Sequence, residues 1–287
     1  MLSTIETSQD TNYSINCKEK TINLDEPIIM GILNLTPDSF FDGGRYSNEG
    51  SIIDQVNTME YEGATIIDVG GHSTRPQAED VSEEEELKRV LPIVKLIQSN
   101  FADLIISIDT FRSNIAKQCI DAGADIINDI SGGNMDSNMF KTVAELKVPY
   151  VLTHLQGTPQ TMQQNPSYTN VLEDVKNYFQ EKIKQLNNLG VNDIILDPGF
   201  GFGKTVEHNF QLLKNLKEFK SFGLPLLAGV SRKSMINKVI GTPPKEALNG
   251  TTVLNTIALQ NGANILRVHD VKEAKEVIQL IHQLRIT

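Results

Sequence analysis

Short apolar runs alternate with amphipathic segments eight times along this chain, and the alternation restricts the fold more than any other feature. Each apolar run has the length of a buried strand, and the segments between them carry apolar residues at helical spacing. Eight such units in one continuous chain, without a change of composition between its halves, favour a closed parallel barrel over an open doubly wound sheet. We therefore predict an α/β fold, a (β/α)8 TIM barrel, with strands at residues 28–34, 65–70, 104–109, 125–128, 149–154, 193–197, 225–230 and 264–268.

The length of 287 residues is close to the ~250 residues typical of one such barrel, so we expect a single domain. Residues 1–12 are polar and are predicted to be disordered, and residues 13–24 are predicted to form an N-terminal β-hairpin before a barrel at 28–285. The helices are expected near 50–62, 83–99, 112–121, 136–146, 169–189, 206–218, 244–260 and 271–285.

Charge and cysteine content exclude several classes of protein. The formal net charge is -10 and no basic stripe is present, so we expect no nucleic-acid partner, and an anionic substrate would need local cations. Cys17 and Cys119 lie far apart, without metal-ligand spacing or a disulfide framework, which favours a reducing compartment. Neither a secretory leader nor an apolar run of ~18 residues is visible, so we expect a cytoplasmic protein that does not enter a membrane.

The phrase DPGFGFGK at 197–204 follows an apolar strand with a carboxylate and a glycine-rich turn, as a binding loop would. It is not a P-loop, because Pro198 occupies the position of the first glycine. It is not a dinucleotide fingerprint either, because Gly199, Gly201 and Gly203 alternate and occur late in the chain. Taken alone, the phrase is equally consistent with a turn that binds no ligand.

Polar residues follow most of the predicted strands. In a barrel, the carboxyl ends of the strands and the loops after them form the active site, so these side chains are expected to converge on one rim. A single Asp or Asn at a strand end is more often a turn former. For His154 a packed, hydrogen-bonded imidazole is the favoured interpretation, and His72 is undecided between packing and function. The strand-end residues are Asn34, Asp109, Asn128, His154, Asp197, Ser231, Arg267 and His269.

Three loops carry further polar candidates. Residues 34–44 combine turn formers with the adjacent aromatics Phe40 and Phe41, and residues 70–76 combine glycines with a hydroxyl and a guanidinium suited to an anion. Both could be ordinary surface loops. The phrase Ser231-Arg232-Lys233-Ser234 is expected to open a short helix whose first N–H groups could bind an anion or a carboxylate, although the same residues could merely cap the helix.

Taken together, eight phrases resemble the dihydropteroate synthases, enzymes of folate biosynthesis with a pterin-binding barrel. The phrases run in that family's order over roughly residues 28–270, so the match is far more specific than any one of them. They are NLTPDSFFDGG (34–44), DVGGHSTRP (68–76), SIDT (107–110), IINDISGG (126–133), HLQGTPQTM (154–162), DPGFGFGK (197–204), GVSRKS (229–234) and RVHD (267–270).

The resemblance implies condensation of 6-hydroxymethyl-7,8-dihydropterin diphosphate with 4-aminobenzoate, releasing pyrophosphate with help from Mg²⁺. It places the pterin against Asp109, Asn128, Asp197, Phe202, Gly229 and Lys233. The diphosphate would meet Asn34, Thr74, Arg267 and His269, with Asn34 also reaching Mg²⁺. The aminobenzoate would meet Phe40, Thr74, Arg75, Pro76, Ser231 and Lys233. The residues expected to act in catalysis are Asp109, Asp197, Lys233, Arg267 and His269.

The local chemistry is consistent with these roles. Carboxylates and an amide oxygen suit the N–H donors of a pterin, and Lys233 suits its carbonyl. The aminobenzoate amine is itself a nucleophile, so no Ser or Cys attacker is needed. The difficult step is loss of the diphosphate, which cationic groups and Mg²⁺ would stabilise, and we expect substitution through a largely dissociated pterin cation.

The chain departs from the family pattern at three positions. Thr153 and Leu155 flank the His of the fifth strand where the family commonly has Met before it and Met or Asn after it, and Phe41 stands where a Ser often occurs. The response to sulfonamides is therefore left open. Two alternatives are a methyltetrahydrofolate-dependent methyltransferase and a catalytically silent pterin-binding relative. Members of the family are commonly dimers, so a homodimer is expected.

Overall fold

The computed structural model describes residues 13–18, 20–35, 45–72 and 81–287, with side chains from residue 49 onward in the third range. It forms the predicted barrel: eight parallel strands pair in chain order, β10 pairs with β3, and a parallel bridge between Leu196 and Leu226 joins β8 to β9. The strands are β3 (Ile28–Asn34), β4 (Ile66–Gly70), β5 (Ile105–Asp109), β6 (Ile126–Asp129), β7 (Tyr150–Thr153), β8 (Ile194–Asp197), β9 (Leu227–Ala228) and β10 (Ile265–Val268).

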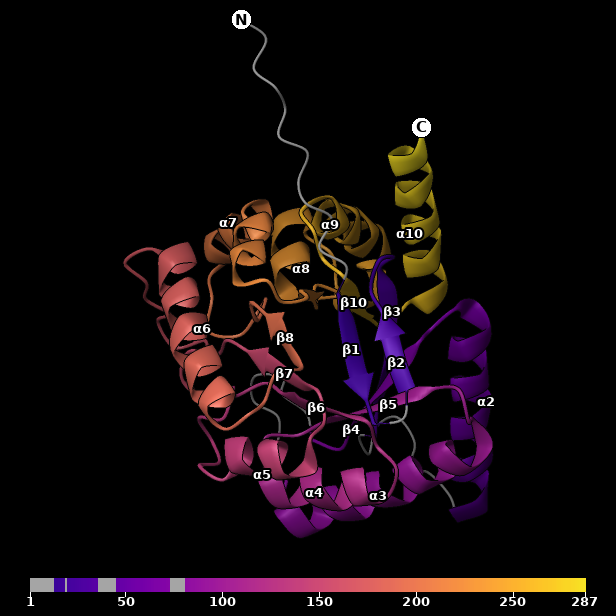
Figure 1. Ribbon diagram of the computed structural model, residues 1–287. Helices are drawn as coiled ribbons and strands as arrows, with labels where there is room; N and C mark the ends of the chain where they lie inside the picture. Colours follow the sequence, from indigo (N-terminus) through magenta and orange to yellow (C-terminus); the bar gives the residue numbers. More distant parts are fainter. Residues whose placement is uncertain (1–12, 19, 36–44, 73–80) are drawn as a thin grey trace, which may run out of the picture.

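The helices form a ring around the strands (Figure 1). Two predicted helices are divided: the segment at 206–218 is α7 followed by a 3-10 helix, and the segment at 244–260 begins with a 3-10 turn at two prolines. The elements are α2 (Arg45–Glu62), α3 (Glu83–Asn100), α4 (Ser113–Asp121), α5 (Met139–Leu146), α6 (Val171–Asn188), α7 (Val206–Lys214), η1 (Leu216–Phe222), α8 (Ser234–Ile240), η2 (Pro244–Glu246), α9 (Leu248–Gln260) and α10 (Val271–Ile286).

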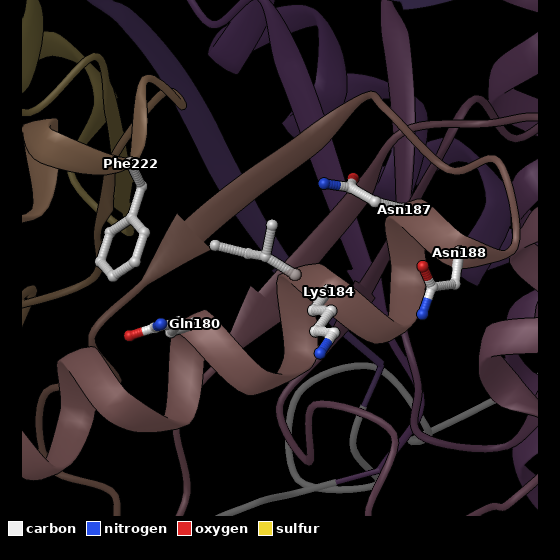
Figure 2. A pocket seen from close by; sticks show the side chains of 6 residues that line it. Gln180, Lys184, Asn187, Asn188 and Phe222 are labelled. Atoms are coloured by element: carbon white, nitrogen blue, oxygen red, sulfur yellow. The ribbon is translucent and has the colours of Figure 1, made fainter.

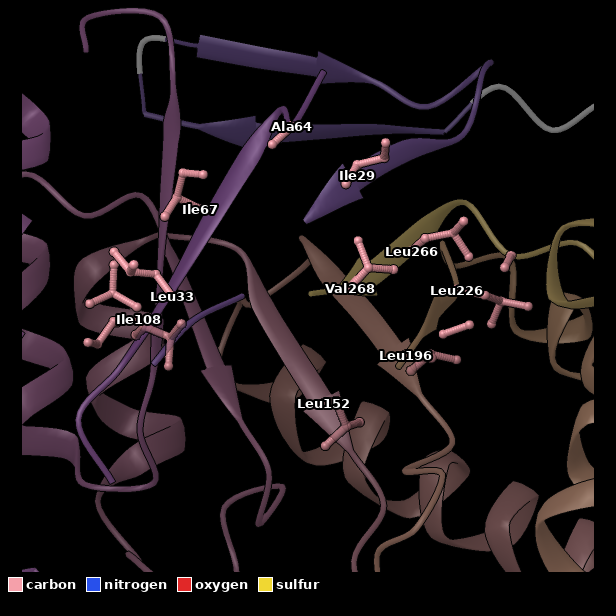
Figure 3. Close-up of a cluster of buried hydrophobic side chains, with 14 of the residues drawn as sticks. Ile29, Leu33, Ala64, Ile67, Ile108, Leu152, Leu196, Leu226, Leu266 and Val268 are labelled. Atoms are coloured by element: carbon pink, nitrogen blue, oxygen red, sulfur yellow. The ribbon is translucent and has the colours of Figure 1, made fainter. Parts of the chain in front are cut away.

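Alternation along each strand divides the apolar residues between two cores. One set, which includes Ile67, Ile108, Leu152 and Leu196, faces outward and packs under the helices (Figure 3). The other set faces the barrel axis near the N-terminal ends of the strands. Its strand members are Met30, Ile66, Ile105, Ile126, Val151, Ile195, Leu227 and Ile265.

The predicted N-terminal hairpin is present as β1 (Ser14–Cys17) and β2 (Lys20–Asn23), and it covers this inner apolar layer. Ile15 is 1% exposed within that cluster. The Lys18 ammonium donates hydrogen bonds to the carbonyls of Ile120 and Ala124, both at 2.9 Å, at the C-terminal end of α4. The hairpin therefore closes one end of the barrel, which leaves the carboxyl ends of the strands for the site. The predicted disorder of residues 1–12 lies outside the described residues.

Among the described residues, no helix combines the length and apolar character that crossing a bilayer requires.

Candidate active site

Above the apolar layer, the inward-facing positions of the barrel become polar. Asp68 lies on β4, two residues beyond Ile66, and Ser107 lies on β5, two residues beyond Ile105. The same step leads to Asn128 on β6, Thr153 on β7, Asp197 on β8 and Arg267 on β10. A barrel interior at this level is normally filled by branched apolar side chains, so a polar layer here forms the floor of a site at the C-terminal end.

Arg267 forms ion pairs with two carboxylates in this part of the barrel. Its Nε donates to Asp68 Oδ2 at 2.7 Å, and its Nη2 donates to Asp109 Oδ2 at 2.7 Å. Asp68 also accepts hydrogen bonds from Ser107 Oγ at 2.6 Å and from Asn128 Nδ2 at 3.0 Å. Because Asn128 donates its amide N–H to Asp68, its carbonyl oxygen remains available to accept from a ligand. The cluster joins four strands, β4, β5, β6 and β10.

The electrostatics of the cluster act on Asp109. Burial raises the pKa of its carboxyl to about 7, although Arg267 opposes the shift, and the negative charge of Asp68 adds to it. A strongly perturbed carboxyl in a polar barrel mouth is a mark of a functional site, because a buried charge with no task would destabilise the fold.

The glycine-rich loop after β8 positions a second carboxylate. Gly199, Gly201 and Gly203 have φ values of 70°, 82° and 62°, which only glycine adopts readily. A Cβ on Gly199 would lie 2.0 Å from the His154 carbonyl oxygen, so the loop also passes too close to β7 for a side chain. The Gly199 N–H donates to Asp197 Oδ1 at 2.8 Å, which fixes that carboxylate at the strand end.

Lys233 reaches the same region from the loop after β9. Its ammonium donates to the carbonyl of Phe200 and lies 4.0 Å from the centre of the Phe202 ring. Burial lowers the pKa of Lys233 to about 8, an effect that Asp197 partly offsets. A cation, an aromatic face and a carboxylate thus meet at one edge of the mouth.

The residues after β9 and β10 are paired with one another. Ser231 Oγ lies 3.0 Å from His269 Nδ1 and also accepts from the His269 backbone N–H. Arg232, in contrast, forms a two-point ion pair with Asp270, at 3.0 and 2.5 Å. Arg232 is therefore engaged by Asp270, whereas the Lys233 ammonium faces the glycine-rich loop at Phe200 and Phe202.

The structure brings together most of the residues that the sequence singled out. Asn34 ends β3 beside β4, and Gly229 lies next to Arg267, where a Cβ would contact the Arg267 Cβ at 3.9 Å. Phe40, Thr74, Arg75 and Pro76 lie outside the described residues. Thr153, the departure on β7, is 1% exposed, and its hydroxyl has no hydrogen-bond partner among the described residues.

Sequence reasoning assigned no role to Asp68, Ser107 or Lys204. Asp68 and Ser107 lie two residues before the ends of their strands, whereas only the terminal residues had been considered. A signal existed: each is a polar residue inside an otherwise apolar strand, at the parity that faces the barrel axis. Lys204 ends the phrase DPGFGFGK, and the sequence offers no partner from which a role for it could be inferred.

The described residues form a hollow away from this site, and they form no metal cluster. Within the described ranges, no group of three or more His, Cys, Asp or Glu side chains could hold a metal ion. A hollow of about 260 Å³ is lined by α6 and by Phe222 (Figure 2). Its residues Asn187 and Asn188 end α6 just before β8 begins, so this part of the hollow lies at the opposite end of the barrel from the charged rim.

Fold and site together define a barrel enzyme with a polar, ligand-binding mouth at the carboxyl ends of its strands. The model of the family described as "Pterin binding enzyme" matches residues 30–269. The chain belongs to this family, and within it to the dihydropteroate synthases.

Relatives and solved structures agree with this placement. The dihydropteroate synthases of Haemophilus influenzae and of Escherichia coli strain K12 are each 45% identical over 91% of this chain, covering 95% and 93% of their own lengths. A Yersinia pestis dihydropteroate synthase solved with a sulfonamide drug superposes with a TM-score of 0.90 at 41% identity, covering 96% of this chain and 100% of that one. A Xanthomonas albilineans enzyme in complex with 7,8-dihydropteroate gives a TM-score of 0.86 at 33% identity, covering 96% and 100%.

Proposed function

We propose that this protein condenses 6-hydroxymethyl-7,8-dihydropterin diphosphate with 4-aminobenzoate to give 7,8-dihydropteroate and pyrophosphate, as a transferase of folate biosynthesis. The observation that carries the proposal is the convergence of Asp109, Asn128, Asp197 and Lys233 on one barrel mouth. These groups match the edge of a pterin, because three oxygen acceptors face its N–H donors and one ammonium faces its carbonyl.

The carboxylates and Lys233 orient the pterin. Each charged hydrogen bond of this kind contributes about 1.5–3 kcal/mol. Phe202 offers a ring face beside the Lys233 ammonium, and Gly229 leaves the space above Arg267 free of a side chain. The pterin ring is thereby held with its methylene carbon toward the rim.

Substitution then occurs at that methylene carbon. The carbon–oxygen bond breaks, the diphosphate leaves with the electron pair, and the amine of 4-aminobenzoate forms the new carbon–nitrogen bond before losing its proton. Asp109 and Asp197 stabilise the cationic pterin as the diphosphate departs. Arg267 has its Nε and Nη2 occupied by carboxylates, which leaves Nη1 to donate to a phosphate oxygen, and His269 is proposed to bind the diphosphate as well.

Mg²⁺ is proposed as the cofactor. The donor set on the described residues fits a metal that arrives with its substrate, because Asn34 is a single neutral oxygen ligand at the end of β3 and no carboxylate cluster surrounds it. Mg²⁺ commonly uses one or two protein ligands together with substrate phosphates and water. Bound there, it would neutralise charge on the leaving diphosphate.

The aminobenzoate is proposed to rest against Ser231, Lys233 and the loops that carry Phe40, Thr74, Arg75 and Pro76. Ser231 is buried at the mouth, where its hydroxyl is oriented by His269. A short hydroxyl held in place at the mouth suits a carboxylate. A Xanthomonas albilineans dihydropteroate synthase has been solved with 4-aminobenzoic acid, which supports this substrate for the family fold.

We further propose a cytoplasmic homodimer. Large apolar side chains are exposed on three helices that pack in sequence: Val239 and Ile240 on α8, Val253 on α9, and Leu280 and Leu284 on α10. An apolar face of this kind, on the outside of the barrel and away from the site, suits a two-fold contact between copies.

The experiment that tests the function is pyrophosphate release from the pterin diphosphate with Mg²⁺, with and without 4-aminobenzoate. Release that depends on 4-aminobenzoate and yields dihydropteroate is the expected result. Pterin binding without any release would instead support a catalytically silent relative.

A further inference from the structure

Lys204 is an unusual lysine, because it is buried and forms no ion pair with the part of the chain that the structure describes. The side chain is 3% exposed. Its Nζ lies 2.9 Å from the Gly199 carbonyl oxygen, 3.0 Å from that of Phe202 and 3.1 Å from that of His154, and it lies 2.9 Å from His154 Nδ1. Among the described residues, no carboxylate accepts a hydrogen bond from it. Three carbonyl oxygens and one imidazole nitrogen therefore surround a single cation.

The glycine-rich loop that ends at Lys204 has backbone carbonyls that are hydrogen-bonded by side chains. Each of the five carbonyls from Gly199 to Gly203 accepts a hydrogen bond from a side chain. Lys204 serves Gly199 and Phe202, and the remaining donors are Lys233 to Phe200, Gln163 to Gly201 at 2.7 Å and Tyr168 to Gly203 at 2.7 Å. Three left-handed glycines prevent a regular ladder, so these carbonyls rely largely on side-chain donors, although the Gly199 carbonyl also accepts from the Phe202 backbone N–H at 3.0 Å.

Lys204 also ties this loop to the neighbouring strand. Its contacts with His154 hold the residue after β7, while its contacts with Gly199 and Phe202 hold the loop after β8. The two segments pack so closely that only glycine fits at 199. The ammonium therefore acts at the junction as a bound cation would, drawing carbonyl oxygens from both segments to one point.

The residues that this junction positions belong to the active site. Gly199 donates its N–H to the Asp197 carboxylate, and the Phe202 ring lies against the Lys233 ammonium. A shift in the carbonyls of Gly199 and Phe202 would move both the carboxylate anchor and the ring.

We propose that Lys204 is a positioning residue that acts as a tethered internal cation and shapes the pterin side of the site without touching the substrate. This inference rests on the proposed function, because that function identifies the ligand as a pterin. His154 is part of the device: burial lowers the pKa of its imidazole well below the usual value and Lys204 adds to this, so the ring stays neutral and Nδ1 accepts. Burial lowers the pKa of Lys204 well below its usual value and the charge of Lys233 adds to this, while the negative charge of Asp197 opposes the shift and favours the ammonium form.

The first test compares Lys204→Met, which keeps the length of the stem and removes the cation, with Lys214→Met, which changes an exposed lysine on α7. We expect Lys204→Met to raise KM for the pterin diphosphate about tenfold or more, with a much smaller effect on KM for 4-aminobenzoate. The Lys214→Met variant should match the wild type. Equal changes in the two KM values, or none, would overturn the proposal.

A second test separates positioning from a general loss of fold. Lys204→Ala leaves a space lined by carbonyl oxygens, so added ammonium or methylammonium should restore pterin affinity at least several-fold in that variant and not in the wild type. Tetramethylammonium at the same ionic strength has no N–H donors and should not restore it. Failure of the small cations in a folded Lys204→Ala variant would overturn the proposal.

Binding is measured by the intrinsic fluorescence of a pterin that lacks the diphosphate, so this test needs no turnover. A wild type that makes no dihydropteroate would contradict the proposed function, whereas a fully active enzyme insensitive to changes at Lys204 would contradict only the positioning role.

Discussion

The Arg267 guanidinium donates a hydrogen bond to the Asp109 carboxylate across the barrel mouth, with Nη2 and Oδ2 at 2.7 Å, and it holds Asp68 with its Nε at the same distance. The ion pair joins β10 to β5, strands separated in the ring by β3 and β4. It places a cation between two buried carboxylates, at the point where the proposed pterin diphosphate would bring both N–H donors and negative charge. The ion pairs with Arg267 therefore influence the charge and the orientation that Asp68 and Asp109 present to the proposed substrate.

The first prediction concerns pH. Because the Asp109 carboxyl has a raised pKa of about 7, it is largely protonated below that pH, and above it the carboxylate accepts with both oxygens and carries a negative charge. Pterin affinity should therefore rise as the pH increases through about 7. Removing the cation with Arg267→Gln should raise the Asp109 pKa further and move the midpoint upward. Pterin fluorescence titrations between pH 5.5 and 8.5 measure this, and a midpoint that moves downward would contradict the assignment.

Lys233 should determine how kcat/KM declines at alkaline pH. Its pKa of about 8 means that the ammonium is lost as the pH rises through that value, so kcat/KM should fall there. Lys233→Ala and Asp109→Ala should each abolish measurable turnover with the fold intact, as judged by circular dichroism. Wild-type-like rates from either variant would show that the pterin is placed wrongly.

Asp68 should matter for stability as well as for binding. It accepts from Ser107, Asn128 and Arg267 in the buried layer, so Asp68→Asn leaves a buried guanidinium with one carboxylate instead of two. We expect a loss of about 3 kcal/mol in the free energy of unfolding, within the range for a broken buried pair, together with weaker pterin binding. Urea unfolding measures the first effect. Asp121→Asn, on the exposed end of α4, should leave both quantities unchanged.

The hairpin should affect stability and not catalysis. Ile15 is buried against the inner apolar layer at the closed end of the barrel. Ile15→Ala should cost about 2–5 kcal/mol in the free energy of unfolding through lost burial and a residual cavity. Both KM values should stay at their wild-type level below the melting temperature. Thr21→Ala, at an exposed position of β2, is the matched control and should change stability by about 0.5 kcal/mol or less.

The proposed dimer can be tested at α10. Leu280 and Leu284 are each 69% exposed and lie one helical turn apart, so they share a face. Leu284→Glu should shift the protein from dimer to monomer at micromolar concentration, as measured by light scattering after size-exclusion chromatography. Leu189→Glu changes an exposed leucine that follows α6 and should leave the mass unchanged. A monomeric wild type would contradict the proposal directly.

The sequence by itself determined the barrel, because strand and helix periodicities are local properties that each segment carries independently of its neighbours. The polar residues after the predicted strands indicated the rim that carries Asp109 and Asp197, whereas the structure showed that Ile66 and Ile105 face the barrel axis. Element boundaries were less well determined: β9 covers only Leu227–Ala228 within the predicted 225–230, between Pro225, which lacks an N–H donor, and Gly229.

Only the tertiary structure decided which polar groups pair. Arg267 and Asp68 are 199 residues apart, and Lys204 and His154 are 50 apart. Periodicity states which way a side chain faces, but the order and stagger of the closed ring decide which inward-facing groups come within hydrogen-bonding distance. For that reason the strand-end residues could be named from the sequence, whereas the roles of Asp68 and Lys204, which depend on partners from other strands and loops, could not.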